Sequence, residues 1–240
     1  MNAPAPEVLR LLCVDLESEP LFTKILADRP REGYEVDVAE SIAQRIGATV
    51  EWIVRPWSRM IPSLLAGEAD AILCGQGITP EREELVTFTR PYAVFDEAIL
   101  VMPGSGITGP DDLAGRTVLA IAGSTNYRLA TSFEGANVVP FDAEGDDVLG
   151  DLVAELRSGR VDAVVDDEVV LHPLCRSGEL EVAFSVATGN RWALAVAPDR
   201  PSTHERLDAA LGEAVAAGDL ERSWTRWMPE IAYPAAGLAR

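Results

Sequence analysis

The sequence predicts an α/β protein made of two lobes of similar plan. Strand-like and helix-like segments alternate from one end of the chain to the other, which is typical of this fold class. A nine-residue pattern, L-x-x-G-x-x-D-A-[IV], occurs at residues 64–72 and again at residues 156–164. Its glycine suits the end of a helix that leads into a buried strand. Any helix-to-strand junction favours such a glycine, so the presence of one copy in each half is what indicates two lobes.

The first half of the chain has the alternation expected of one lobe. Apolar side chains recur at helical spacing along residues 34–46, which predicts a helix with one buried face. Short apolar runs on either side of it predict buried strands. The predicted strands are residues 8–14, 49–54 and 69–73, and the predicted helices are residues 34–46 and 57–65.

The second half repeats this order after a strand-like crossing. Its predicted strands are residues 98–102, 117–122, 161–165 and 192–197, and its predicted helices begin near residue 126 and span residues 148–158 and 202–228, the last broken near Gly218. We expect lobe 1 to contain residues 1–97 and 197–240, and lobe 2 to contain residues 98–196. The crossings, near residues 98–102 and 191–197, predict two Rossmann-like lobes joined by a two-strand hinge.

Composition excludes several classes of function. The chain has 240 residues with 39 acidic and 20 basic side chains, a net charge of −19, which argues against nucleic acid or an anionic membrane as partner. No apolar run is long enough to insert into a bilayer. Three isolated cysteines and two distant histidines indicate neither a disulfide framework nor a metal site, and we expect no cofactor. Residues 1–7 lack the features of a signal peptide, and residues 3–6 predict a flexible leader.

The first candidate site is the segment that follows the strand at residues 69–73. Thr79 is a good N-cap and Pro80 a good first helical residue, so a helix is expected to begin here. Its free N–H groups and Arg82 are expected to favour a carboxylate. Gly75 and Gly77 would leave backbone amides open to a ligand. In the alternative interpretation, Arg82 only pairs with the glutamates that follow it on a solvated surface.

Two further strand ends carry polar residues, as expected of ligand sites at the carboxyl ends of strands. Ser124, Thr125 and Asn126 follow the strand at residues 117–122, where short polar side chains are more often helix caps than ligand groups. The three consecutive carboxylates at residues 166–168 can cap a helix or accept hydrogen bonds from a ligand ammonium. Trp57, at another strand-to-helix turn, is either packing or a surface on which a ligand stacks.

Several motifs, taken in order, resemble one family. They are G-Y-E-V-D-V-A at residues 33–39, W-x-x-M-I-P-x-L-x-x-G-x-x-D-A at residues 57–71, I-T-P-E-R at residues 78–82, F-T-R-P-Y at residues 88–92, and G-S-T at residues 123–125. Each is weak alone, but together they span about residues 8–228. The chain resembles the polar-amino-acid family of extracellular solute-binding proteins, family 3, which has the type II periplasmic-binding fold.

The resemblance implies a role for each candidate residue. Arg82, aided by Thr125, would hold a ligand α-carboxylate, and Asp167 would receive the α-ammonium. Trp57 would stack on the ligand side chain, with Ser124 and Asn126 at its border; Gly75, Gly77 and Thr79 would contribute backbone or hydroxyl contacts. Serines are common in the family where the two glycines stand here, and the aromatic residue usual near Ser18 is missing. The side-chain pocket is therefore expected to differ from that of most members.

We predict a solute-binding protein, not an enzyme, that captures an amino acid or related small zwitterion or carboxylate for ABC-type uptake. One alternative is an enzyme like the cyclohexadienyl dehydratases of the same fold, with an acid from residues 166–168 as general acid. Another is a binding protein that serves sensing instead of transport. The resemblance implies a monomer outside the cytoplasmic membrane with an ABC permease as partner, while the N-terminus leaves a cytoplasmic location open.

Overall fold

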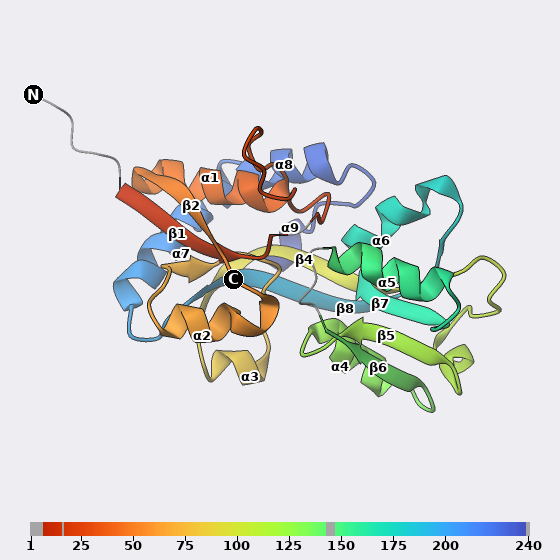
Figure 1. Ribbon diagram of the computed structural model, residues 1–240. Coiled ribbons are helices and arrows are strands. Elements are labelled where there is room, and N and C mark those ends of the chain that lie inside the picture. Colours follow the sequence, from red (N-terminus) through yellow and green to blue (C-terminus); the bar gives the residue numbers. More distant parts are fainter. Residues whose placement is uncertain (1–6, 16, 143–146, 239–240) are drawn as a thin grey trace, which may run out of the picture. The chain divides into compact units, whose positions relative to one another are not determined.

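The computed structural model describes residues 7–15, 17–142 and 147–238. The predicted leader at residues 3–6 lies outside the described residues. The chain divides into two compact units, each described below by itself. Unit 1 contains Met1–Asp15, Pro20–Val94 and Arg191–Arg240, and unit 2 contains Leu16–Glu19 and Phe95–Asn190. Both consist of strands and helices (Figure 1), which confirms the predicted α/β class.

Unit 1 is built around a central parallel strand. β1 (Glu7–Cys13) pairs in parallel with β2 (Ala48–Val54) on one side and β3 (Ala71–Ile72) on the other. The end of β8 (Glu181–Val196) runs antiparallel beside β3. The helical segments are α1 (Tyr34–Ile46), η1 (Trp57–Arg59), α2 (Met60–Leu65), α3 (Pro80–Glu83), α7 (Pro201–Ala216), α8 (Asp219–Trp227) and α9 (Ala235–Leu238). Helix α1 packs against β2, α7 and α8.

Unit 2 repeats the strand plan of unit 1. β5 (Thr117–Ile121) lies between β6 (Asn137–Phe141) and β7 (Ala163–Asp167) and is parallel to both. The end of β4 (Thr87–Val101) runs antiparallel beside β7. The helical segments are η2 (Pro110–Leu113), α4 (Thr125–Ser132), α5 (Val148–Arg157), α6 (Glu168–Leu174) and η3 (Cys175–Ser177). In each unit, therefore, the first parallel strand is central and the third lies beside a long antiparallel strand.

The glycines of the repeated pattern end two helices in the same way. Gly67, after α2, has φ +77° and donates its N–H to Leu64 O at 2.9 Å. Gly159, after α5, has φ +72° and donates to Leu156 O at 3.0 Å. The N–H of the residue after each glycine also bonds to the helix: Glu68 N–H donates to Ser63 O, and Arg160 N–H donates to Glu155 O. This second hydrogen bond completes a Schellman motif. The predicted role of both glycines is confirmed.

The aspartates of the repeated pattern tie two strands together in each unit. Asp70 Oδ2 accepts from Arg10 N in β1 at 2.9 Å, and its Oδ1 pairs with the Arg10 guanidinium at 2.8 Å. Asp162 Oδ2 accepts from Thr117 N in β5 at 2.8 Å. The repeated aspartate is thus a structural residue that fixes where the third strand enters beside the first.

Each unit has its own buried core. Tyr34 and Trp224 are fully buried in unit 1 and meet edge-to-face with ring centroids 5.4 Å apart. The core of unit 2 is made of buried aliphatic side chains from its strands and connecting segments: Ile99, Val101, Ile107, Leu113, Val118, Ala120, Ala130, Ala163 and Val165. These cores fix the strands whose ends carry the candidate site residues.

Several elements differ from those predicted. β4 and β8 are much longer than the strands predicted at residues 98–102 and 192–197; β4 runs through Pro91, and β8 begins at Glu181. β6 was not predicted; it contains Pro140 and pairs with β5 at the end of the strand order, where a missing N–H is tolerated. Helix α6 begins at the three carboxylates of residues 166–168, where a capped helix was one of two interpretations; its extent was not predicted, and Pro173 lies inside it. In β4, β6 and α6 the local preference of proline is outweighed by strand pairing and by the burial of the surrounding side chains.

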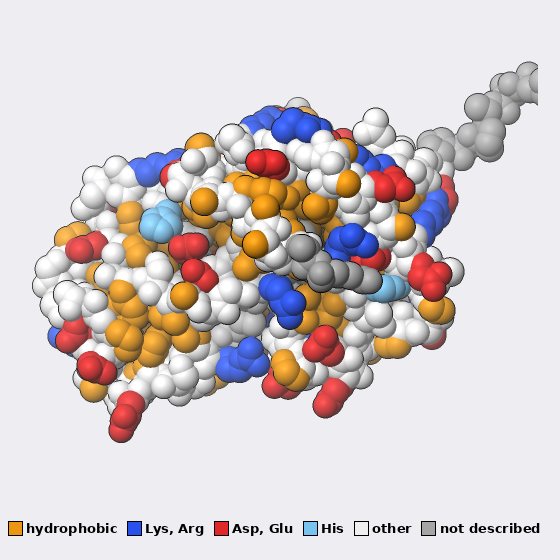
Figure 2. All heavy atoms as spheres, turned by 180° about the vertical axis from the view of Figure 1, so that it is seen from behind, with side chains coloured by type: hydrophobic (Ala, Val, Ile, Leu, Met, Phe, Trp, Pro, Cys, Tyr) orange, Lys and Arg blue, Asp and Glu red, His pale blue; other side chains and the backbone are white. Residues whose placement is uncertain are grey.

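The surface agrees with the strongly acidic composition. On the face shown in Figure 2, acidic side chains are scattered among polar and apolar ones instead of being gathered in one patch. Among the described residues, no helix has the length and apolar character needed to cross a membrane.

Candidate functional site

Arg82 lies in a short capped helix of unit 1, α3. The Thr79 side chain accepts from Arg82 N at 3.3 Å, and Pro80 is the first residue of α3, as predicted. The helix is a single turn, Pro80–Glu83, so its dipole is much weaker than the predicted anion site required. Any affinity of this segment for a carboxylate therefore depends on the Arg82 guanidinium more than on the helix.

The Arg82 guanidinium is held by the loop that precedes α3. Its Nη1 donates to Gly77 O at 2.8 Å. With its side-chain amide turned so that the oxygen faces the guanidinium, buried Gln76 accepts from Nε at 3.0 Å and from Nη1 at 3.1 Å. The guanidinium carbon lies 5.5 Å from the centre of the half-buried Trp57 ring, a cation–π distance. Arg82 and Trp57, both predicted as site residues, are thus in contact.

The two glycines of this loop have different roles. Gly75 donates its N–H to Glu35 Oε1 at 2.7 Å, so this amide is used inside unit 1 and is not open to a ligand as predicted. Gly77 lies opposite Trp192 in a bridge whose hydrogen bonds are made by the residues on either side of it. The Gly77 peptide groups therefore point away from Trp192, and its C=O is the one that meets Arg82.

A buried acid accepts a hydrogen bond from the loop that precedes α3. Glu35, in α1, is 1% exposed, and its Oε1 accepts hydrogen bonds from Gly75 N–H and from the Tyr92 hydroxyl. Within the described part of the chain its other oxygen, Oε2, has no hydrogen-bond partner. Burial raises the pKa of Glu35, and the two hydrogen bonds only partly oppose this.

The polar residues at the start of α4 in unit 2 are largely engaged with each other. Ser124 is the N-cap; its hydroxyl accepts from Tyr127 N at 3.0 Å and donates to Ile121 O at 2.7 Å. Thr125 Oγ1 accepts from the Asn190 amide at 2.9 Å. The capping interpretation of Ser124 is therefore the one that the contacts support most directly.

Three carboxyl groups lie beside this helix start; Glu97 and Asp166 are buried, and Asp167 is half-buried. Asp166 and Asp167 end β7, and Glu97 in β4 pairs in register with Asp167. Asn126 Nδ2 donates to Asp166 Oδ1 at 2.8 Å, as does Asp167 N at 2.8 Å. Asp167 stands at the N-cap position of α6, yet its side chain makes no capping hydrogen bond.

Burial disfavours the charged form of all three acids. It raises the pKa of Asp166 to about 6. It raises the pKa of Asp167 well above its usual value, and the charges of Asp166 and Glu97 add to the effect. It also raises the pKa of Glu97, against hydrogen bonds from Thr188 and Thr125. A cation placed among these groups would restore their ionised forms.

Three residues of these arrangements were not predicted as site residues. Gln76 was hidden between two glycines, and Asn190 lies in β8 just before the strand predicted at residues 192–197. Glu97 had a detectable signal, because it directly precedes the apolar run that predicted the strand at residues 98–102. Two other charged residues near strand ends have contacts within unit 1: Arg55 Nε donates to Glu68 Oε2 at 2.7 Å, and Asp15 Oδ1 accepts from Ile25 N at 2.7 Å.

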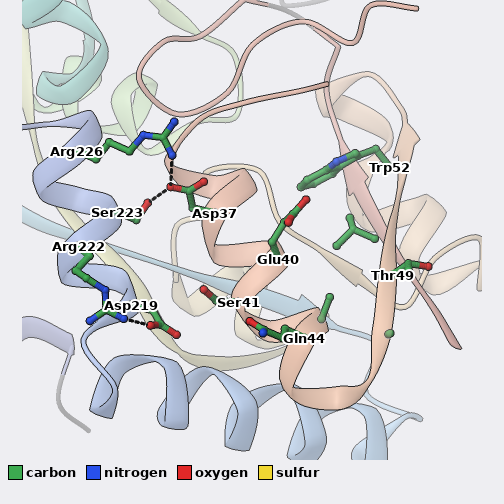
Figure 3. A pocket seen from close by; sticks show the side chains of 13 residues that line it. Asp37, Glu40, Ser41, Gln44, Thr49, Trp52, Asp219, Arg222, Ser223 and Arg226 are labelled. Atoms are coloured by element: carbon green, nitrogen blue, oxygen red, sulfur yellow. Dashed lines mark hydrogen bonds and ion pairs between the residues drawn. The ribbon is translucent and has the colours of Figure 1, made fainter. Parts of the chain in front are cut away.

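A separate groove of about 910 Å³ lies on unit 1 between α1, β2 and α8 (Figure 3). Its charged side chains pair with one another. Asp37 accepts from Ser223 Oγ at 2.7 Å and lies 3.8 Å from Arg226, and Asp219 pairs with Arg45 at 2.6 Å. These contacts join α1 to α8, so the groove is explained by the packing of the two helices.

Comparison with known proteins identifies the family. The model of the bacterial extracellular solute-binding proteins, family 3, matches residues 12–230. The chain belongs to this family. A curated member, the ABC transporter arginine-binding protein 1 of Escherichia coli, is 26% identical over 88% of this chain and 87% of its own length.

Solved structures of this family are also similar. An ancestral arginine-binding protein bound to arginine is 27% identical, with a TM-score of 0.82 over 92% of this chain and 98% of that chain. An ancestral arginine-binding protein bound to glutamine is 27% identical, with a TM-score of 0.82 over 93% of this chain and 99% of that chain. These relatives are binding proteins, which confirms the prediction of a solute-binding family 3 protein over a dehydratase-like enzyme.

Proposed function

We propose that this family 3 protein binds a free L-α-amino acid through both of its charged ends. The α-carboxylate would bind the Arg82 guanidinium of unit 1, and the α-ammonium would bind Asp167 of unit 2. The observation that carries the proposal is Asp167 Oδ1, which is buried and has no hydrogen-bond partner among the described residues. A buried acceptor left in this state costs free energy unless a ligand satisfies it.

The other predicted residues would complete the site. Trp57 lies against Arg82 and offers its ring to the apolar part of the ligand side chain. The Gly77 peptide and the Thr79 hydroxyl would add contacts to the carboxylate, and Thr125 would assist from unit 2. Ser124 and Asn126 would border the ligand, while Gly75 contributes by holding the loop to Glu35.

The relatives suggest which amino acids to test first. The proteins compared above are described as arginine-binding, and one is solved with glutamine. We therefore propose L-arginine and L-glutamine as the first candidate ligands. A thermal-shift screen over the standard amino acids, followed by calorimetry, would test this. A ligand present at about 100 times its Kd should add about 2.7 kcal/mol of stability.

Two analogues of L-arginine test recognition of its α-carboxylate and its α-ammonium separately. Agmatine lacks the carboxylate of arginine, and 5-guanidinopentanoic acid lacks its α-ammonium. We expect both to bind at least about 10-fold more weakly than L-arginine, because each leaves one charged protein group without its partner. Equal affinity for all three compounds would contradict recognition through both ends of the ligand, and no stabilisation by any amino acid would overturn the proposed function.

We further propose that the protein works outside the cytoplasmic membrane as the capture component of an ABC importer. The family membership and the named transporter relative support this. A monomeric binding protein that delivers its ligand to a permease is the expected arrangement. Uptake of the radiolabelled ligand should fall in cells that lack the gene, and the protein should be found in the extracytoplasmic fraction; a purely cytoplasmic protein would contradict the proposal.

A further inference from the structure

Glu97 is an acid that stands directly before the apolar end of strand β4. Its neighbours in β4, from Ala98 to Val101, are fully or almost fully buried hydrophobic residues. Glu97 itself is only 2% exposed. It stands directly opposite Asp167 on the neighbouring antiparallel strand β7. Residues paired in this way have side chains on the same face of the sheet, within a few ångströms of each other.

Both members of this pair have an oxygen that the protein does not satisfy. Within the described residues, Glu97 Oε2 and Asp167 Oδ1 are each buried and have no hydrogen-bond partner. Thr125 and Thr188 interact with Glu97, and Asn126 and Asn190 lie near Asp167, so donors surround the pair without reaching these two atoms. A matched pair of unsatisfied acceptors is costly, which points to a donor that comes from outside the chain.

The charges around the pair are mostly negative. Asp166 accepts hydrogen bonds at the end of the same strand, Asp96 precedes Glu97, and Glu168 follows Asp167. The arginine that acts on Glu97 is Arg128, and the His172 ring lies 3.9 Å from Glu168. Neutral donors would leave most of this negative potential in place, so the missing donor is expected to be a cation.

We propose that Glu97 and Asp167 together bind one primary ammonium group of the ligand, with a carboxylate oxygen from each strand as acceptor. The inference deepens the proposed function and rests on it. An ammonium carries three N–H donors in a compact group. Two of them would meet Glu97 Oε2 and Asp167 Oδ1. Glu97 is then a ligand-binding residue that sets a requirement for at least two N–H donors on the ligand amine.

The substitution Glu97→Gln tests the proposal because it preserves the size of the side chain and removes its charge. Calorimetry would compare L-arginine with 5-guanidinopentanoic acid, which lacks the ammonium. We expect Glu97→Gln to weaken L-arginine binding about 10- to 100-fold and to leave the des-amino compound nearly unchanged. The control Glu168→Gln removes a nearby charge next to Asp167 and should change both affinities by less than about 3-fold.

A second measurement uses the wild-type protein alone, in case Glu97→Gln does not fold. Nα-methyl-arginine retains two N–H donors, and Nα,Nα-dimethyl-arginine retains one. A pair of carboxylate acceptors predicts a large loss of affinity at the dimethyl compound, because only one of the two acceptors can then be met. If Asp167 supplied the only acceptor, the two methylated compounds would bind with similar affinity.

The outcomes distinguish this inference from the proposed function. Selective loss of L-arginine binding in Glu97→Gln, or a steep loss at the dimethyl compound, supports a role for Glu97. Tight binding of L-arginine by Glu97→Gln, or equal weakening of both ligands, would overturn that role and leave the proposed function intact. If neither L-arginine nor L-glutamine binds the wild-type protein, the two ligands are replaced by the amino acid that stabilises it most. Failure of every amino acid would overturn the proposed function together with this inference.

Discussion

In unit 1 the Arg82 guanidinium is surrounded by acceptors, whereas in unit 2 the Glu97 and Asp167 carboxyls each keep an oxygen without a hydrogen bond. Arg82 meets Gly77 O, Gln76 and the Trp57 ring. This cation is held in place by its own unit before any ligand arrives. The acids of unit 2 are buried instead at a cost that their neighbours only partly offset.

This difference follows from the chemistry of the two groups. A guanidinium stays charged at any pH that a protein meets, so its position must be fixed by hydrogen bonds and stacking. A buried carboxyl can take up a proton until a cation displaces it, as the raised pKa of Asp166 to about 6 indicates. We therefore expect Arg82, at the unit 1 end of the proposed site, to be held rigidly before the ligand binds. We expect the acids at the unit 2 end to make ligand binding depend on pH.

The largest expected effect is the loss of the guanidinium. Arg82→Ala should weaken binding of L-arginine by about 2–5 kcal/mol, or roughly 30-fold to several thousand-fold, because a ligand carboxylate would lose its charged partner. Calorimetry gives this affinity directly. Arg59→Ala, which removes an exposed arginine from η1, is the matched control and should have little effect. Unchanged affinity in Arg82→Ala would remove the unit 1 end from the proposed site.

A buried acid of unit 1 gives a contrast with those of unit 2, because its role is structural. Glu35→Ala should lower the free energy of unfolding by about 2–4 kcal/mol, since it leaves the Tyr92 hydroxyl without its acceptor, leaves Gly75 N–H only its longer contact with Tyr92 Oη at 3.2 Å, and creates a cavity. Urea denaturation measures this change. Glu40→Ala, on the exposed face of the same helix, should change it by less than about 0.5 kcal/mol. Equal effects of the two substitutions would contradict the supporting role of Glu35.

The acids of unit 2 should make stability depend on pH in a defined direction. The pKa of Asp166 is about 6 in the folded protein and 3.8 when unperturbed. Between these values the folded state holds more protons than the unfolded state, so the contribution of Asp166 to stability falls as pH rises. Between about pH 4 and about pH 7, the free energy of unfolding of Asp166→Asn should rise by up to about 3 kcal/mol relative to that of the wild type.

Urea denaturation of both proteins without ligand measures this difference. If the stability difference between Asp166→Asn and the wild type does not change over that range, folding does not raise the pKa of Asp166 and the proposed difference between the two ends is wrong. Addition of L-arginine should reduce the difference, because a bound cation stabilises the ionised acids.

The smallest expected effect concerns the placement of Arg82 and not its charge. Gln76→Met removes the side-chain acceptor of the guanidinium and retains the length of the side chain. We expect about 10-fold weaker binding of L-arginine, the scale of one hydrogen bond to a charged group. Binding of agmatine, which has no carboxylate, should be unaffected. The control Gln44→Met, on the exposed surface of α1, should alter neither affinity.

Much of the fold was predictable because it depends on local patterns. The 3.6-residue spacing of apolar side chains marked α1 with its observed bounds, and the glycine and aspartate of the repeated pattern marked the same junction in both units. The motifs that resemble family 3 are also local, and the family model confirms them. β6 and the full lengths of β4 and α6 were not predicted; each of these elements contains a proline whose local preference is outweighed by burial or strand pairing.

The sequence by itself determined the fold class, the family, and Arg82 and Asp167 as candidate residues, since each depends on residue type and spacing within a short segment. Only the tertiary structure decided which amides and acids are already in use. Gly75 turned out to bond Glu35, 40 residues earlier in the chain, and Glu97 turned out to face Asp167 across a strand pair. Hydrogen bonding between distant segments depends on strand register and packing, which no local pattern encodes.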